Sequence, residues 1–259
     1  MYKRQEYGPA IPPPGKPTHP PTLLAERDLL PKPIPLTAVE KQRLRCLDLS
    51  ASYNLAWEDM AEMKFLFDFE DKPKPIREWW ITPGLAAAAM PAEVESADGV
   101  KYRLSGRGKG EAGKKNLLAM ASWEPYPLPG GARISVGRKC ERLYLLLQSY
   151  TTPSRCYIPN GEVELFYADG TSKRLQLIPP FNLDCYYQHF SREGVAVPLG
   201  EFDWPKGWTP VGKETSLAHA DSLAIACDPG RELRAVEIRA TCSHVVIAVA
   251  GITLLEPAN

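Results

Sequence analysis

The chain has 259 residues, with 31 basic and 31 acidic side chains, so its formal net charge at pH 7 is zero. This balance argues against the basic surface that nucleic-acid binding requires, and against electrostatic attachment to an anionic membrane. No stretch approaches the roughly 18 consecutive apolar residues of a membrane span, so we expect no membrane insertion. The length suffices for one large core, because β-sandwiches often exceed about two hundred residues as a single domain.

The N-terminal part of the chain predicts an extension rather than a folded layer. Its first five residues, Met-Tyr-Lys-Arg-Gln, resemble the translation of a transposon-based sequencing adapter. On that interpretation upstream sequence is missing; the alternative is an ordinary basic tail. Residues 7–36 hold ten of the chain's 26 prolines, which fix φ and remove backbone donors. We expect residues 1–36 to be an adapter-derived scar plus Pro-rich linker, and residues 37–257 to form a single β-sandwich domain.

After the linker, one short helix precedes a series of strands. Thr37 and Glu40 have the spacing of a capping box, which predicts a helix over residues 39–47. Beyond it, short apolar or alternating runs are separated by Pro, Gly and Asp-Gly, the pattern of an all-β chain. The predicted strands cover residues 63–69, 76–81, 100–104, 117–122, 143–149, 162–167, 173–178, 222–227, 233–241 and 244–255.

Two of these runs give the clearest signals. Residues 161–177 alternate on both sides of Asp169-Gly170, which predicts a hairpin whose turn fixes its register. Residues 245–255 are nearly continuous in apolar side chains, which predicts a central strand. Half-buried strands must hide their apolar faces against a second layer. The sequence therefore predicts a two-sheet antiparallel β-sandwich of jelly-roll type with a Pro-rich N-terminal extension.

The cysteines give little guidance on chemistry. Six are spread along the chain and none forms a CxxC pair, which excludes zinc-ribbon and thioredoxin motifs. Cys227 and Cys242 fall in apolar alternating runs, where a free cysteine behaves as a small buried hydrophobe. Disulfides are the alternative, so the redox compartment stays open.

Two familiar enzyme patterns occur without their contexts. Residues 108–114 match the GxxxxGK spacing of a phosphate-binding loop, but Lys115 stands where that loop needs Ser or Thr, and a strand is predicted next. We therefore expect an exposed hairpin loop there. Paired carboxylates are typical of glycoside hydrolases. Three pairs occur, all at positions typical of solvated strands or turns, so we expect no catalytic residues: Glu58 with Asp59, Glu162 with Glu164, and Glu201 with Asp203.

His219 and Asp221 form a more specific pattern. Their i, i+2 spacing in a strand places both side chains on one face. Three roles stay open: a structural hydrogen-bonding pair, direct ligand contact, or a metal site with a third ligand from His189, His244 or Asp184. We expect no cofactor, with a structural calcium ion as the open alternative.

Aromatic residues are the most informative class. Exposed rings stack on sugar C–H surfaces while polar groups bond the hydroxyls, which is typical of polar-ligand sites. Residues 203–208 place two indoles in a Pro/Gly-rich stretch, an unusual setting for core residues. The alternative for each is burial. The predicted ligand-binding residues are Trp79, Trp80, Tyr150, Arg155, Tyr187, Trp204, Trp208, His219 and Asp221.

Several motifs carry a family resemblance. They are residues 142–155, Tyr167-Ala-Asp-Gly-Thr171, His219-Ala-Asp221, Cys227-Asp-Pro229 and residues 245–254. Together they resemble a galactose-binding-like (jelly-roll) β-sandwich module of large, mostly uncharacterised bacterial carbohydrate-active proteins. The resemblance covers about residues 48–256 and is stronger in the second half. The sequence departs from the pattern where Cys227 replaces a usual Leu and where Arg155-Cys156 replaces a small polar pair.

The resemblance implies an ancillary carbohydrate-binding or scaffold module in a larger bacterial glycan-degrading protein. It implies a poly- or oligosaccharide partner, an upstream catalytic domain, and a parent protein that is periplasmic or extracellular. Two alternatives stay open. A stand-alone polysaccharide lyase or glycoside hydrolase would need Arg155, Tyr150, His219 and His189 to converge in one cleft. A purely structural interdomain module would present a large exposed apolar patch. 

Overall fold

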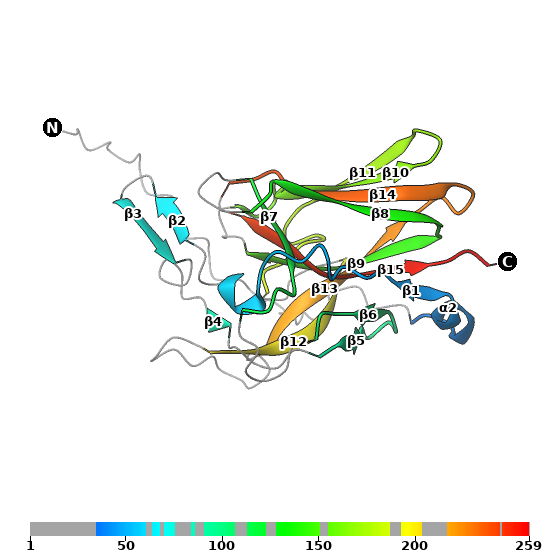
Figure 1. Cartoon of the computed structure of the whole chain (residues 1–259), viewed down its shortest axis with the longest axis horizontal. Coiled ribbons are helices and arrows are strands. Elements are labelled where there is room, and N and C mark those ends of the chain that lie inside the picture. The colour runs from blue at the N-terminus through cyan, green and yellow to red at the C-terminus, as the bar shows by residue number, and fades with distance from the viewer. Residues whose placement is uncertain are drawn as a thin grey trace, which may run out of the picture. The chain divides into compact units, whose positions relative to one another are not determined.

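The computed structural model describes residues 35–60, 64–67, 70–75, 84–85, 91–106, 113–122, 128–150, 155–186, 193–203, 217–243 and 245–258. All of them belong to the unit of the chain that runs from Pro31 to Asn259. Strands dominate this part, and neighbouring strands pair antiparallel (Figure 1). The prediction of an all-β chain with antiparallel sheets is therefore confirmed. Within the described residues, no helix is long and apolar enough to cross a membrane.

The described chain begins with the short helix α2 (Ala38–Gln42). The predicted capping box is present: the Thr37 hydroxyl accepts from the Glu40 amide, and the Glu40 carboxylate accepts from the Thr37 amide. The helix is shorter than predicted, because β1 (Leu44–Cys46) follows at once and pairs with the C-terminal strand. Tertiary pairing thus overrides the helical pattern of these three residues.

The larger sheet has the strand order β1-β15-β9-β13-β12-β4, with β7 also paired to β15. Because β15 bonds to β1, β7 and β9, the prediction of a central strand near the C-terminus is confirmed. The bounds of these strands are β4 (Gly84–Leu85), β7 (Leu118–Ala121), β9 (Arg142–Tyr150), β12 (Val195–Asp203), β13 (Leu217–Ala226) and β15 (Val246–Leu255).

The smaller sheet has the order β11-β10-β14-β8. Its β10–β11 hairpin pairs Gly161 with Leu177 and turns at Gly170, whose φ is +86°, so the predicted hairpin is confirmed. The strands are β8 (Gly131–Lys139), β10 (Gly161–Tyr167), β11 (Ser172–Leu177) and β14 (Glu232–Ala240). Smaller elements are η1 (Trp57–Met60), the pair β2 (Lys64–Phe67) and β3 (Glu70–Pro75), and the pair β5 (Glu93–Glu95) and β6 (Lys101–Arg103).

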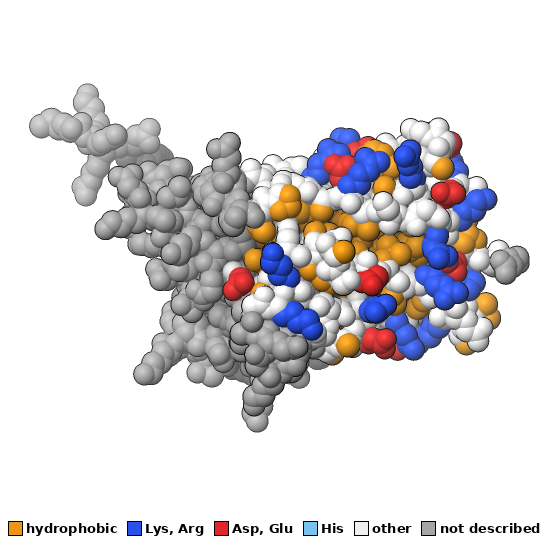
Figure 2. Space-filling view, in the orientation of Figure 1, with side chains coloured by type: hydrophobic (Ala, Val, Ile, Leu, Met, Phe, Trp, Pro, Cys, Tyr) orange, Lys and Arg blue, Asp and Glu red, His pale blue; other side chains and the backbone are white. Residues whose placement is uncertain are grey.

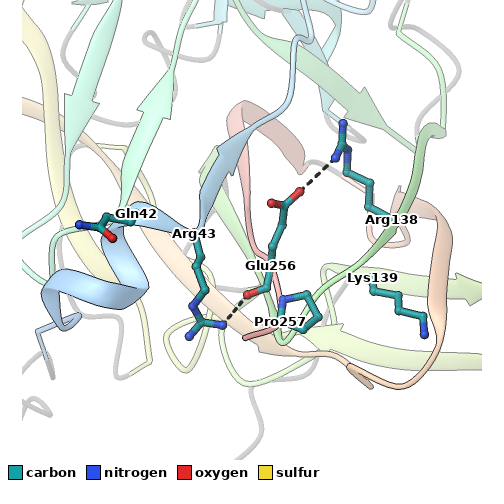
Figure 3. A pocket seen from close by; sticks show the side chains of 6 residues that line it. All are labelled: Gln42, Arg43, Arg138, Lys139, Glu256 and Pro257. Carbon is teal, nitrogen blue, oxygen red and sulfur yellow. Dashed lines mark hydrogen bonds and ion pairs between the residues drawn. The ribbon is translucent and has the colours of Figure 1, made fainter. Parts of the chain in front are cut away.

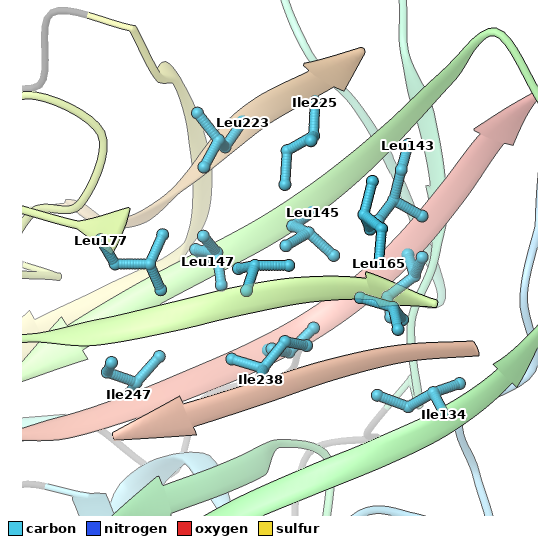
Figure 4. Close-up of a cluster of buried hydrophobic side chains, with 14 of the residues drawn as sticks. Ile134, Leu143, Leu145, Leu147, Leu165, Leu177, Leu223, Ile225, Ile238 and Ile247 are labelled. Carbon is cyan, nitrogen blue, oxygen red and sulfur yellow. The ribbon is translucent and has the colours of Figure 1, made fainter. Parts of the chain in front are cut away.

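An apolar core lies between the two sheets, as expected for a sandwich-like fold (Figure 4). Leu143, Leu145 and Leu147 on β9 contribute one side of this core. Leu165 on β10 and Ile238 on β14 contribute the other. The odd-numbered residues of β9 therefore face the smaller sheet, as the two-residue period of a strand requires.

The larger sheet also buries its second face. Tyr144, Leu146 and Tyr150 on β9 belong to another core cluster, together with Tyr102 on β6 and Trp57 in η1. A strand that is covered on both faces must be apolar at nearly every position. This explains why the sequences of β9 and β15 show little alternation.

Several strands were not predicted, for identifiable reasons. In β8 only Ile134 is fully buried, because this strand lies at the edge of the smaller sheet and exposes its charged side chains. β12 contains Pro198, and its pairing with β13 shifts register between Pro198 and Gly200. Proline within a run argues against a strand in sequence-based reasoning. The predicted strand over residues 76–81 lies outside the described residues.

Candidate functional site

Asp184, His219 and Asp221 form a buried polar cluster. One potential ligand atom from each lies within 4.8 Å of the other two. The His219 Nε2 to Asp221 Oδ1 distance is 3.8 Å. Three residues were candidates for the third ligand. The structure brings Asp184 to the pair, whereas His189 and His244 lie outside the described residues.

Strand geometry places the two β13 members of this cluster. The strand pairs with β9 without a register shift, so His219 and Asp221 lie on the same face as Leu223 and Ile225. Leu223 and Ile225 belong to the core between the sheets. The cluster therefore projects towards the smaller sheet.

Asp184 reaches the cluster because β9 and β13 separate. Their pairing ends at Leu147 and Asp221. Beyond it, the Ser149 amide donates to the Asp184 carbonyl at 3.0 Å, and the Ser149 hydroxyl donates to the same oxygen at 2.7 Å. The His219 amide donates to the Tyr186 carbonyl at 2.8 Å. Residues 184–186 thus lie between the diverging ends of the two strands.

This donor set could hold a divalent cation. Two carboxylates and one imidazole match the ligands of zinc or manganese, whereas calcium prefers an all-oxygen shell of about six to eight ligands. One Asp184 oxygen already accepts from the Cys185 amide at 2.8 Å, which fixes the orientation of that carboxylate. Structural calcium at this position stays a prediction.

The remaining predicted ligand-binding residues are dispersed. Tyr150 is fully buried against Tyr186, with ring centroids 5.8 Å apart, on the face of β9 opposite the one that contributes to the inter-sheet core. It therefore presents no surface for stacking and shares no cleft with His219. Arg155 donates to the Ser243 hydroxyl at 3.2 Å. The other predicted residues lie outside the described part of the chain: Trp79, Trp80, Tyr187, Trp204 and Trp208.

An exposed aromatic pair was missed by sequence reasoning. Tyr157 is 73% exposed and Phe181 is 37% exposed. Their ring centroids are 6.0 Å apart and their planes meet at 75°. With Ile158, they make up three of the four exposed large hydrophobic residues found among the described residues. Single exposed apolar residues are ordinary, but a contiguous group indicates contact with a ligand or partner.

Backbone contacts fix this pair in place. Tyr157 has φ of +64°, which is uncommon for a residue other than glycine, and its amide donates to the Pro179 carbonyl at 2.7 Å. The buried side chain of Asn182 accepts from the Ile178 amide at 2.8 Å and donates to the Gln176 carbonyl at 3.0 Å. These hydrogen bonds hold the two turns that carry the rings.

The paired carboxylates that the structure describes are structural. Glu164 forms ion pairs with Arg174 at 3.0 Å and with Arg239 at 3.1 Å, and Glu162 pairs with Arg239 at 3.0 Å. A hydrogen bond from Ser172, together with the nearby Arg174, holds the pKa of Glu164 below its usual value. These groups form an ion-pair ladder on the outer face of the smaller sheet. Glu164 is buried within it, so the predicted solvated position is wrong for this residue. The side chains of Glu58, Glu201 and Asp203 lie outside the described ones.

The described surface mixes both signs of charge. In the view of Figure 2, basic and acidic side chains lie next to each other rather than in separate fields. After residues 107–112, which are not described, the chain forms strand β7 and not a helix. The phosphate-loop pattern therefore lacks the helix whose amides would cradle phosphate.

One open cavity of about 450 Å³ lies near the C-terminus and is rich in basic groups (Figure 3). Both of its arginines already have partners. Arg138 pairs with the Glu256 carboxylate at 3.0 Å, and Arg43 donates to the Glu256 carbonyl at 2.6 Å and to Glu141 at 2.8 Å. These contacts tie residue Glu256 to β8 and to the C-cap of α2, so both arginines have a structural role.

Comparison with known proteins gives no family for the chain. No family model matches it, and no curated protein or solved structure matches it either. The galactose-binding-like resemblance therefore stays a prediction, and the functional argument rests on the geometry described above.

Proposed function

We propose that this chain is a non-catalytic, carbohydrate-binding β-sandwich module of the galactose-binding-like, jelly-roll type, ancillary to bacterial glycan degradation. The observation that carries the proposal is the exposed Tyr157–Phe181 pair, held on turns at the end of the β10–β11 hairpin. Fully burying an aromatic side chain stabilises a fold by about 1.5–3 kcal/mol. The partly exposed rings of Tyr157 and Phe181 contribute less than that to stability. Rings held in water in this way are typical of sites that stack on sugars.

The geometry of the pair suits a single sugar ring. With planes at 75°, the two side chains form a corner in which one ring presents a face and the other an edge. A pyranose C–H face can rest on one ring while the second limits its lateral movement. One polar residue is held next to the pair: the amide of the exposed Glu193 donates to the Phe181 carbonyl at 2.9 Å, and its carboxylate could bond sugar hydroxyls.

The same arrangement argues against a stand-alone enzyme. That alternative requires Tyr150 and His219 in one cleft, but their side chains lie on opposite faces of the larger sheet. The described carboxylate pair on β10 is bound in ion pairs. A binding module needs neither a nucleophile nor an acid–base pair, so the described geometry favours binding over catalysis.

Affinity electrophoresis against plant, algal and mucin polysaccharides tests the proposal. We expect at least one polysaccharide to retard the full chain, and Tyr157→Ala or Phe181→Ala to weaken that affinity roughly tenfold, equivalent to about 1.4 kcal/mol. Val39→Ala is the matched control, because Val39 is an exposed apolar residue in α2 and should leave retardation unchanged. If no polysaccharide retards the chain, the binding role is overturned and a scaffold role is left.

A further inference from the structure

Cys140 and Cys227 lie where the chain passes between the two sheets. Cys140 connects β8 of the smaller sheet to β9 of the larger one, and Cys227 follows β13 of the larger sheet and precedes β14 of the smaller one. The Cys227 amide donates to the Glu141 carbonyl at 2.9 Å, directly after the register pair of Ala226 with Arg142. The two crossovers are therefore adjacent.

The two thiols are in direct contact. Both side chains pack on the core between the sheets, with Cys140 fully buried and Cys227 half-buried. A hydrogen bond joins them, and it raises the pKa of Cys140 while it lowers the pKa of Cys227. The Cys227 thiol also lies 3.6 Å from the Ile225 carbonyl, to which it can donate. Cys140 is buried, so Cys227 is the more accessible sulfur of the two.

Cys227 is also the thiol that small molecules can reach. It lines an open cavity of about 450 Å³. The ammonium group of Lys173 donates to the Ala226 carbonyl at 2.7 Å, and its charge contributes to the lowered pKa of Cys227. The Asp228 carboxylate is neutralised by Arg231 at 2.9 Å. The other residues of the cavity are Tyr167, Ser172 and Pro229.

We propose that Cys140 and Cys227 form a peroxide-sensitive dithiol, in which Cys227 attacks and Cys140 resolves. An accessible thiolate with a thiol neighbour is the usual setting of reversible cysteine oxidation. The Cys227 thiolate attacks a hydroperoxide: an S–O bond forms, the O–O bond breaks, and the departing oxygen takes a proton to leave as an alcohol or water. The Cys140 thiol then attacks the sulfenic acid, so the S–S bond forms, the S–O bond breaks and water leaves. Two thiols are oxidised and one peroxide is reduced.

The resulting disulfide would join both crossovers at one end of the sandwich. It would close a loop of about 90 residues, and a cross-link of that span stabilises chiefly by restricting the unfolded chain. We expect the Tm of the oxidised protein to rise on the order of 5–10 °C, reversed by a dithiol reductant.

Peptide mapping of the full chain under non-reducing conditions tests the pair. After graded hydrogen peroxide treatment, we expect a peptide linked through Cys140 and Cys227 to form roughly ten times faster than oxidation of the exposed Cys46, whose thiol donates to the Lys101 carbonyl. In Cys140→Ser, dimedone should trap a sulfenic acid on Cys227. In Cys227→Ser, Cys140 should stay reduced.

The wild-type measurement needs no variant to fold, so it decides the proposal by itself. A linked peptide that is lost on reduction supports it. Oxidation of Cys46 before Cys227, or linkage of Cys227 to any cysteine other than Cys140, would overturn it. Because glycan retardation is measured separately, the result is independent of the proposed carbohydrate binding.

Discussion

The two ends of the β9–β13 pair differ, and the difference separates two kinds of chemistry. At one end the strands stay paired up to Arg142 and Ala226, and two thiols meet across the crossovers. At the other end the strands diverge beyond Leu147, and residues 184–186 enter between them. The paired end buries apolar groups and sulfur. The divergent end gathers carboxylates and an imidazole, because inserted backbone brings polar side chains into the sheet.

The largest expected effect comes from the strand that both ends share. Leu145 is fully buried in the middle of β9, so Leu145→Ala should lower the free energy of unfolding by about 2–5 kcal/mol through lost burial and a cavity. Urea denaturation followed by circular dichroism measures this loss. Leu175→Ala, at a half-buried position of β11, is the control and should cost less. Equal costs at the two positions would contradict the assignment of β9 to the centre of the core.

The divergent end depends on Ser149. Ser149→Ala removes the buried hydroxyl bond to the Asp184 carbonyl and should destabilise the fold by about 1–2 kcal/mol. Hydrogen exchange sharpens the comparison of the two ends. The amides of Tyr186 and His219 should exchange faster in the variant, whereas the Cys227 amide at the paired end should keep its protection. Equal acceleration at both ends would show that the two ends do not behave separately.

Acid should affect the smaller sheet through Glu164. Its folded-state pKa lies below the ordinary value of 4.5, because the Ser172 hydroxyl and Arg174 favour the carboxylate. The stabilisation is therefore complete above about pH 4.5 and is lost as the pH falls through the folded-state pKa. Glu164→Gln should flatten the dependence of Tm on pH below that value, while Glu193→Gln, at an exposed residue, should leave it unchanged. An unaltered acid profile in Glu164→Gln would contradict the ion-pair ladder.

The smallest effect on stability is expected at the aromatic pair. Tyr157→Ala removes a largely exposed ring, so the Tm should change by no more than about 2 °C even though glycan affinity falls. Differential scanning calorimetry measures this. A large drop in Tm would show that the ring supports the turn rather than a ligand.

Much of the fold could be predicted because the burial of a strand determines which of its positions are apolar. β15 is covered by neighbours on both faces, which produces a nearly continuous apolar run. The β10–β11 hairpin carries its turn at Asp169-Gly170. β8 was missed because it is an edge strand with only Ile134 fully buried, so its charged residues conceal the period.

The candidate sites were less predictable. The spacing of His219 and Asp221 indicated a shared face, but Asp184 is distant in sequence and arrives only through the divergence of two strands. Exposure of Tyr157 is a tertiary property that composition does not reveal. Proline and asparagine follow Tyr157 in Tyr157-Ile-Pro-Asn160, and two prolines precede Phe181. Both patterns predict turns, where an aromatic side chain can be exposed.

The central claim is that Tyr157 and Phe181 form a sugar-binding platform. A glycan microarray probed in parallel with the full chain and with the Tyr157→Ala/Phe181→Ala double variant tests it most directly, with matching Tm values as the check on folding. We predict that the wild type binds a defined subset of glycans and that the double variant loses that subset. Binding of the same glycans by both proteins would contradict the claim, as would failure of the wild type to bind any.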